Sequence, residues 1–398
     1  MKHHLPVTVL EADSCSGTLV LAFGADFHVA DRGGSLIAST TDDNTVSGSP
    51  AVKIEKAEDG AAIKAAAFSR DGSLLAVCTA NKSVLIYETA GWTCLRRTVA
   101  EKRVNAVCFD PTGDYLVTGD KFGDAYRVSV RGEQEKHEVL LGHVSIICDV
   151  KFTLSTPAAP QQYILTCDRD EKIRVSKYPN SYNIQAFCLG HTEFVTTIST
   201  AAFAPESVVS GSGDGTVRLW NVASGRLLQT VELEQCLAKY YAEGRAVCGE
   251  NTFEDRTAST ERYGVLRIRA CDKLHAFVAV VERIPAVIVI PFAEAAGLGS
   301  PQVIDLARAP IDVAVADDRV VVSLVPASMA AQGTSSAKYS ATQVAVLKAD
   351  GNGLLALDGE LSDALNKIGT PETDKAPEIG SIYAWGNKMY LERPKNDD

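Results

Sequence analysis

The segment 207–221 (SVVSGSGDGTVRLWN) constrains the fold of this chain most strongly, because it has the pattern of a complete β-hairpin. Val208 and Val209 begin an apolar strand, Asp214-Gly215 is a tight two-residue turn, and a return strand ends at Trp220. A Gly190-His191 pair precedes the hairpin at the spacing typical of a propeller blade. One blade cannot bury its own faces, so the pattern predicts that the unit repeats.

The hairpin turn recurs upstream at Asp170, Phe122-Gly123 and Asn81-Lys82, at intervals of 44, 48 and 41 residues. These intervals match the roughly 40 to 45 residues of a four-stranded WD-repeat blade. A second marker follows the same period, the apolar segments Ala67-Phe68-Ser69, Val107-Cys108-Phe109 and Val150-Lys151-Phe152. Two markers with one period predict an all-β fold, a seven-bladed WD-repeat β-propeller.

The whole chain, residues 1–398, is predicted to form a single propeller domain. We expect blade 1 at about 6–58, blades 2–5 at 61–233, an insertion at 234–262, blades 6–7 at about 263–358, a flexible segment at 369–378 and a strand pair at 380–391. A short helix is expected in the insertion and another at 360–368. The first and last segments are expected to share a blade, because that arrangement removes exposed strand edges.

Composition excludes several classes of function. A formal net charge of −11 makes this chain a poor candidate for gripping nucleic acid alone, since phosphate binding needs clustered Lys and Arg. The ten cysteines contain no CxxC pair, which favours small buried thiols in a reducing compartment over disulfides or zinc. No run of 18 apolar residues occurs, so we expect no membrane partner.

His191 is predicted to stabilise blade 5 from within. Its expected partners are Asp214, Trp220 and either Ser210 or Ser212, since buried polar groups in a blade pair with one another. A catalytic role would need further convergent groups, and no HExxH, GxSxG, P-loop or paired-carboxylate pattern is present. We therefore predict no catalytic, cofactor-binding or metal-binding residue and no enzyme.

The segment Asp168–Arg174 (DRDEKIR) carries six charges in seven residues across a hairpin turn, and Ser176 follows where blade 5 has Trp220. A solvated turn is one interpretation. The other is a docking site, because mixed charges on a rigid tip reward one binding register. A set of basic residues also has two interpretations: they belong to solvated loops, or they contact a phosphate backbone. These residues are Arg96, Arg97, Lys102, Arg103, Arg127 and Arg131.

Three segments, LGHVSIICDVKF, YILTCDRDEKIRVSKYPNSYNIQAFCLGHTEFVTTIS and SGSGDGTVRLWNVASGRLL, resemble the WD-repeat, non-catalytic subunit of the eukaryotic tRNA (guanine-N7)-methyltransferase. The resemblance implies a nuclear heterodimer in which a separate catalytic chain binds S-adenosylmethionine and forms 7-methylguanosine at position 46, in the variable loop of tRNA. The present chain would bind and stabilise that catalytic chain and hold no cofactor itself.

The resemblance also implies which residues face the partner: Asp170, Glu171, Lys172 and Arg174, with His191 and Glu193 nearby. Arg174 is expected to clamp a partner carboxylate, so that Arg174→Ala weakens the complex and leaves the propeller folded. The alternative function is a general WD-repeat adaptor, such as a substrate receptor of a ubiquitin ligase. Recovery of ligase components, and not a methyltransferase, on co-purification would favour that alternative.

Overall fold

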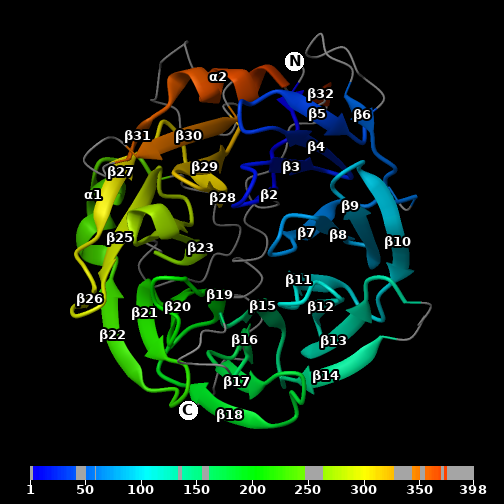
Figure 1. The fold of residues 1–398 in the computed structure, drawn as a ribbon. Coiled ribbons are helices and arrows are strands. Elements are labelled where there is room, and N and C mark those ends of the chain that lie inside the picture. The colour runs from blue at the N-terminus through cyan, green and yellow to red at the C-terminus, as the bar shows by residue number, and fades with distance from the viewer. Residues whose placement is uncertain are drawn as a thin grey trace, which may run out of the picture.

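Seven of the eight sheets in the described part of the chain are arranged as a ring around a central channel (Figure 1). The structure is a computed structural model that describes residues 3–41, 51–58, 60–132, 137–154, 161–246, 263–326, 343–349, 355–368 and 372–373. Each of these seven sheets is an antiparallel meander whose strands follow one another in the chain, with two exceptions: β6 joins blade 1 in parallel, and β27 pairs with β25 in blade 6. The prediction of a seven-bladed β-propeller is confirmed.

The first four blades run from the N-terminal segment to residue 188. Blade 1 contains β2 (Val9–Ala12), β3 (Leu19–Phe23), β4 (Asp26–Ala30), β5 (Leu36–Ser39) and β6 (Val52–Lys53). Blade 2 contains β7 (Ile63–Phe68), β8 (Leu74–Thr79), β9 (Ser83–Glu88) and β10 (Thr93–Val99). Blade 3 contains β11 (Val104–Phe109), β12 (Tyr115–Asp120), β13 (Asp124–Ser129) and β14 (Glu138–Gly142). Blade 4 contains β15 (Ile147–Phe152), β16 (Tyr163–Asp168), β17 (Ile173–Lys177) and β18 (Ile184–Cys188).

The last three blades and two helices complete the ring. Blade 5 contains β19 (Val195–Ser199), β20 (Ser207–Ser212), β21 (Thr216–Asn221) and β22 (Leu227–Glu232), and is followed by α1 (Glu234–Ala242). Blade 6 contains β23 (Val265–Cys271), the 3-10 turn η1 (Asp272–Leu274), β24 (Ala276–Val281), β25 (Ala286–Ala293), β26 (Gly297–Leu298) and β27 (Gln302–Asp305). Blade 7 contains β28 (Pro310–Ala316), β29 (Arg319–Leu324), β30 (Val344–Ala349) and β31 (Leu355–Leu357), and is followed by α2 (Gly359–Ile368).

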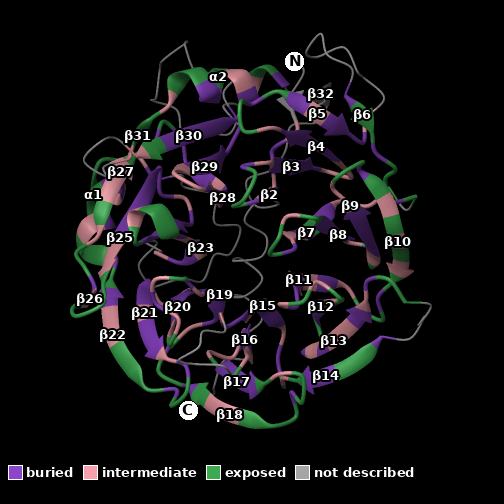
Figure 2. Cartoon of the chain, viewed as in Figure 1, coloured by how far each residue is buried: buried purple, intermediate pink, exposed green. Residues whose placement is uncertain are grey.

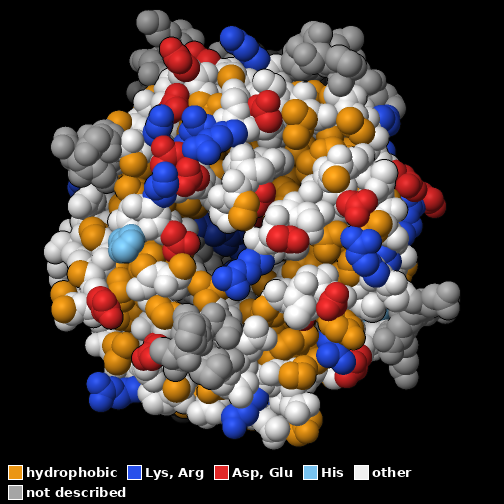
Figure 3. Space-filling view, viewed as in Figure 1, with side chains coloured by type: hydrophobic (Ala, Val, Ile, Leu, Met, Phe, Trp, Pro, Cys, Tyr) orange, Lys and Arg blue, Asp and Glu red, His pale blue; other side chains and the backbone are white. Residues whose placement is uncertain are grey.

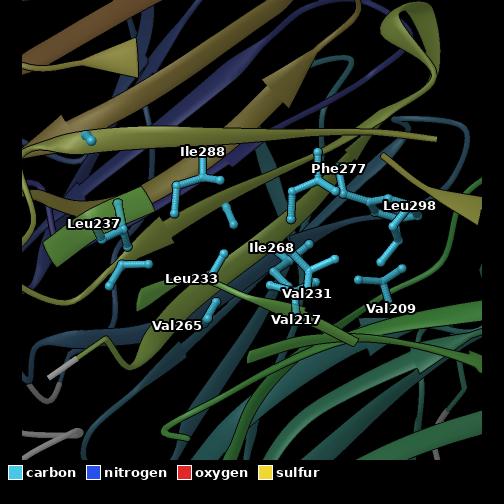
Figure 4. Packing of buried hydrophobic residues seen from close by; sticks show 14 of the residues in the cluster. Val209, Val217, Val231, Leu233, Leu237, Val265, Ile268, Phe277, Ile288 and Leu298 are labelled. Carbon is cyan, nitrogen blue, oxygen red and sulfur yellow. The ribbon is translucent and has the colours of Figure 1, made fainter. Parts of the chain in front are cut away.

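The hydrophobic core is divided among seven clusters, each between two adjacent blades. Figure 4 shows the cluster between blades 5 and 6, where Val217 and Ile268 meet and Leu237 of α1 covers the outer part. Inner strands are buried and most outer strands are partly exposed (Figure 2). Because every sheet buries both faces against neighbours, no blade is an independent folding unit.

The ring does not close through a shared blade, so that expectation is wrong for the described residues. The inner strand β28 of blade 7 is joined to β2 of blade 1 by Asp312, whose Oδ2 accepts the Leu10 N–H at 3.0 Å. Outside, α2 lies across both blades, and Leu365 packs with Leu36 of blade 1 and Val346 of blade 7. Closure therefore uses a buried carboxylate and a helix, each of which connects two complete blades.

Some of the predicted segments differ from the structure or lie outside it. The segment expected to be flexible includes β32 (Glu372–Thr373), which pairs antiparallel with β1 (His3–His4). The strand pair expected at 380–391 and residues 247–262 of the insertion lie outside the described residues. No helix in the described part of the chain is long and apolar enough to cross a membrane.

In blades 3, 4 and 5, the turn between the second and third strands lies beside the connection from the preceding blade. The Lys121 N–H donates to Arg103 O, that of Arg169 to Ile146 O, and that of Gly213 to Phe194 O, at 3.1, 3.0 and 2.9 Å. These turns and connections therefore share one face of the ring, which we call the tip face.

Candidate docking surface

The turn of the charged hairpin between β16 and β17 is held by left-handed backbone geometry. Glu171 has φ of 71°, at the position where blade 5 has Gly215 with φ of 77°. A left-handed conformation is unusual for a residue with a Cβ, so the turn must be stabilised by its neighbours. The Lys172 N–H donates to Asp168 Oδ1 at 2.9 Å and supplies one such contact.

The histidine of blade 4 binds a different acid from the one that the repeat pattern indicates. His143 Nδ1 lies 2.8 Å from Asp168 Oδ2, and its Nε2 lies 2.6 Å from Thr166 Oγ1. Asp170, which aligns with the histidine-binding Asp214 of blade 5, is not part of this network. Because Asp168 at the end of β16 already binds the imidazole, the carboxylate of Asp170 stays at the surface, half-exposed and 3.5 Å from Arg169 Nε.

In blade 5, His191, Asp214 and Trp220 are linked through Ser210. The Trp220 indole donates to Ser210 Oγ at 2.8 Å, Ser210 Oγ lies 2.7 Å from His191 Nε2, and His191 Nδ1 lies 2.8 Å from Asp214 Oδ2. A carboxylate only accepts, so Nδ1 is the protonated nitrogen towards Asp214. This chain of contacts occupies both ring nitrogens of His191 inside the blade, where the side chain is 0% exposed.

The same network sets the acidity of Asp214. Burial alone would raise the pKa of this carboxyl, but the hydrogen bond and charge of His191, with Thr216 and the Thr192 N–H, hold the pKa at about 2. His191 and Asp214 therefore stabilise the blade together. The sequence analysis also placed His191 at the partner interface. In the structure both of its ring nitrogens have partners inside the blade, so neither is exposed for such a contact.

Arg174 points into its own blade, whereas the sequence analysis expected it to clamp a partner carboxylate. Its Nε donates to Ser176 Oγ at 2.8 Å, Nη1 to Gly142 O at 3.0 Å and Nη2 to Ser181 O at 2.9 Å. Only 8% of the residue is exposed, and burial lowers the pKa of the guanidinium. Since Ser176 stands where blade 5 has Trp220, the guanidinium stabilises the part of blade 4 where the tryptophan is missing.

Three of the hairpin residues predicted to face a partner lie at the surface, beside the half-exposed Arg169. Asp170 and Glu171 are half-exposed and Lys172 is exposed, with its Nζ 3.1 Å from Asp170 O. We call these three residues the blade 4 tip. Glu193 lies on the next connection of the tip face, half-exposed, and its carbonyl accepts the Ser212 hydroxyl. Of the residues predicted to face a partner, the structure therefore leaves the blade 4 tip and Glu193 accessible.

Most of the basic residues considered for phosphate contact are engaged elsewhere. Arg97 pairs with Glu55 and Glu58, Arg127 with Glu138, and Arg131 with Glu88. Lys102 behaves differently, because its Nζ lies 5.1 Å from the centre of the Phe122 ring.

An aromatic residue that the sequence analysis did not select lies among these cations. Phe122 is 57% exposed, and the Nζ atoms of Lys102 and Lys121 both lie 5.1 Å from its ring centre. Among the described residues, Lys102, Arg103 and Lys121 have no carboxylate within ion-pair distance. The sequence feature that could have indicated this surface is an aromatic residue in a turn, since Phe122 follows Lys121 and precedes Gly123.

Other kinds of site find little support in the described part of the chain. No group of three or more His, Cys, Asp or Glu side chains there could hold a metal ion. A pocket of about 200 Å³ lies between blades 4 and 5, lined by Tyr163, Pro205 and Asn221 among others, at the strand ends opposite the tip face. Around the channel mouth on the face seen in Figure 3, acidic and basic side chains alternate. The tip face therefore remains the candidate site.

A propeller whose His143 and His191 stabilise their own blades, and whose charged hairpin lies at the surface, has the features of a WD-repeat protein. The model of the WD domain, G-beta repeat, matches residues 52–88 and 92–124. The model described as tRNA methyltransferase TRM82 WD40 domain matches residues 129–349, more than half of the chain. The chain belongs to this family.

Similar proteins have names that agree with the family. A Mus musculus protein named tRNA (guanine-N(7)-)-methyltransferase non-catalytic subunit WDR4 is 37% identical over 227 residues, covering 55% of this chain and 54% of that protein. The Xenopus laevis protein of that name is 34% identical over 253 residues, covering 63% and 59%. The chain thus spans about half the length of the curated relatives it matches.

Solved structures show the same fold at low sequence identity. A chain of "Crystal Structure of Mitotic Checkpoint Complex" has a TM-score of 0.61 at 15% identity, covering 81% of this chain and 88% of that chain. "Crystal structure of RRP9 WD40 repeats" also has a TM-score of 0.61, at 18% identity and with the same coverage. These likenesses bear on the propeller fold alone.

Proposed function

We propose that this chain is the non-catalytic subunit of a tRNA (guanine-N7)-methyltransferase and acts by binding and stabilising the catalytic chain. Membership of the family and the names of its relatives support the proposal. The structural observation that carries it is the blade 4 tip, which presents Asp170, Glu171 and Lys172 outward on the tip face. Mixed charges on a fixed turn suit docking to one partner, because they penalise other registers.

The hairpin below the tip is rigid, which favours tight docking. Asp168 binds both His143 and the Lys172 N–H, and Arg174 ties β17 to the carbonyls of Gly142 and Ser181. A surface that is already ordered loses little conformational entropy when it binds. The tip can therefore present its charges in one geometry before the partner arrives.

In this proposal the methyl transfer takes place on the partner chain. The catalytic chain would bind S-adenosylmethionine and transfer the methyl group to a guanine in the variable loop of tRNA, in the nucleus. The described residues of the present chain contribute contacts and no group that makes or breaks a bond.

The cations around Phe122 support a contribution to tRNA contact on the same face. Lys102, Arg103 and Lys121 can neutralise phosphates, and an exposed aromatic ring can stack on a base. The Arg103 connection and the Lys121 turn are joined by a backbone hydrogen bond of 3.1 Å, so they form one surface on blade 3. Three cations are few for a chain of net charge −11, so the complex must supply the rest.

The decisive experiment uses the purified chain and the purified methyltransferase chain. Titration calorimetry should show a complex, and methylation of tRNA by the catalytic chain should rise when this chain is added. The double variant Glu171→Gly/Lys172→Glu should bind about tenfold more weakly or worse, with a changed dependence on salt. Glycine at 171 keeps the left-handed turn, so the fold should survive.

A matched control exists on another blade. Lys82 has φ of 75° at the corresponding turn of blade 2, so Lys82→Gly removes a charged side chain from the same backbone geometry. It should leave binding and methylation unchanged. Failure of the wild-type chain to bind the methyltransferase or to raise its activity would overturn the proposal.

A further inference from the structure

Exposed apolar side chains are concentrated around blade 4. Of the thirteen large hydrophobic residues that are exposed in the described part of the chain, five lie there. We call these five the blade 4 rim: Val144, Tyr182, Ile184, Phe187 and Leu189. Val144 is 99% exposed and Leu189 is 61% exposed. Single exposed apolar residues are ordinary, whereas a group of them on one element marks an interaction surface.

The blade 4 rim is continuous with the blade 4 tip. Ile173 pairs with Cys188 and Arg174 with Phe187, so Leu189 follows directly where β18 reaches the tip face. Val144 lies on the other side, in the connection whose flanking carbonyls of Gly142 and Ile146 bind Arg174 and the Arg169 N–H. From Leu189 the rim continues back along β18 through Phe187 and Ile184 to Tyr182, which precedes the strand.

Three other outer strands are paired with a further strand, bridged to a neighbouring blade or carry an ion pair. β5 is paired with β6, and β22 is bridged to β26 by the Gln229 amide, which binds the Leu298 carbonyl and N–H at 2.6 and 2.7 Å. On β14, Glu138 pairs with Arg127. On β18, Gln185 Nε2 donates to Ala223 O of blade 5 at 2.9 Å, and the Gly225 turn of blade 5 lies close to the Phe187 carbonyl.

An open edge strand with apolar side chains favours aggregation unless something covers it. The sheet behind this edge is well packed, because Ile173, Val175 and Cys188 are fully buried. The rim side chains therefore extend from a sheet that is well packed on its blade 5 side.

We propose that the blade 4 rim binds apolar side chains of the same catalytic methyltransferase chain whose charged groups meet the blade 4 tip. The inference rests on the proposed function and extends its contact surface from the tip along β18. The partner segment would be amphipathic, with charges at the end that meets Asp170, Glu171 and Lys172 and apolar side chains along the rest.

The chemistry favours this occupant over RNA. The five rim side chains carry no positive charge, whereas RNA binding draws on Lys and Arg. A second copy of this chain is the other candidate occupant, and light scattering separates it in the test below.

The test compares a rim variant with a matched control. Ile184→Ser/Leu189→Ser should bind the methyltransferase chain about tenfold more weakly or worse, as expected for loss of buried apolar anchors. Its remaining binding should be more sensitive to salt than that of the wild type, because charged contacts would supply more of it. Val99→Ser, at a 65% exposed position on the outer strand β10, should bind like the wild type.

Three outcomes separate the possibilities. If the rim variant binds normally while Glu171→Gly/Lys172→Glu binds weakly, the rim inference is wrong and the proposed function stands. If the wild-type chain dimerises alone by light scattering and the rim variant is monomeric, the rim is a self-contact and the inference is also wrong. If the wild type and Val99→Ser both fail to bind, the proposed function itself fails. Thermal melting checks that each variant is folded.

Discussion

The Nδ1 atom of His143 lies 2.8 Å from Asp168 Oδ2, so blade 4 takes the acid for its histidine from the end of β16. Blade 5 uses Asp214, which is two residues further along the repeat and lies in the turn itself. The shift moves the internal hydrogen bond back along the hairpin. It leaves the Asp170 carboxylate half-exposed in the turn, where it lies 3.5 Å from Arg169 Nε and not in the histidine network.

Replacing Arg174 should destabilise the propeller. Arg174→Ala leaves the carbonyls of Gly142 and Ser181 without the donors that they have now, and opens a cavity beside Ser176. The free energy of unfolding in urea should fall by about 2 to 4 kcal/mol, the scale for breaking a buried charged hydrogen-bond network. Lys172→Ala, at an exposed position in the same hairpin, should change it by less than about 0.5 kcal/mol.

Asp214 should make stability depend on pH in the acid range. Its pKa is lowered to about 2 in the folded protein, below the usual 3.8, so the folded state favours the ionised carboxylate. The resulting stability, on the order of 2 kcal/mol, is present above pH 4 and is lost as the pH falls towards 2. Melting temperatures of the wild type and Asp214→Asn should therefore converge at low pH. A constant gap down to pH 2.5 would contradict the assignment, and Asp363→Asn, on an exposed part of α2, is the control.

Leu365 should be important for closing the ring. It is 2% exposed and packs against blades 1 and 7 together, so Leu365→Ala leaves a cavity at the point where the chain must join its two ends. We expect a loss of about 2 to 4 kcal/mol in the free energy of unfolding. Hydrogen exchange should rise first in blades 1 and 7. Equal protection of all seven blades in the variant would argue that α2 does not hold the closure.

The cations around Phe122 should affect RNA more than assembly. In the complex with the methyltransferase chain, Lys121→Glu/Phe122→Ala should raise the KM for tRNA several-fold, because it removes a phosphate contact and a stacking surface. The affinity between the two chains should stay unchanged. Weakened assembly with an unchanged KM would place these residues at the subunit contact instead. Arg131→Glu, whose parent side chain is already paired with Glu88, serves as the control.

Local patterns in the sequence were sufficient to predict the propeller fold and the hydrogen-bond network inside blade 5. The hairpin period, the turn at Asp214-Gly215 and the pair formed by His191 and Trp220 act over a few residues or within one sheet. Turn geometry and strand alternation depend on nearby residues, so a single sequence reveals them. For the same reason the helix expected at 360–368 agrees with α2.

Only the tertiary structure decided which charges face outward and how the ring closes. Arg174 lies in a charged segment that suggests a docking residue, yet its guanidinium is bound inside blade 4 by carbonyls from two neighbouring segments. Asp312 reaches Leu10 across 302 positions of sequence, a contact that no local pattern encodes. The direction of a long charged side chain depends on which acceptors the fold brings near it, because a buried charge needs partners that only distant segments can supply.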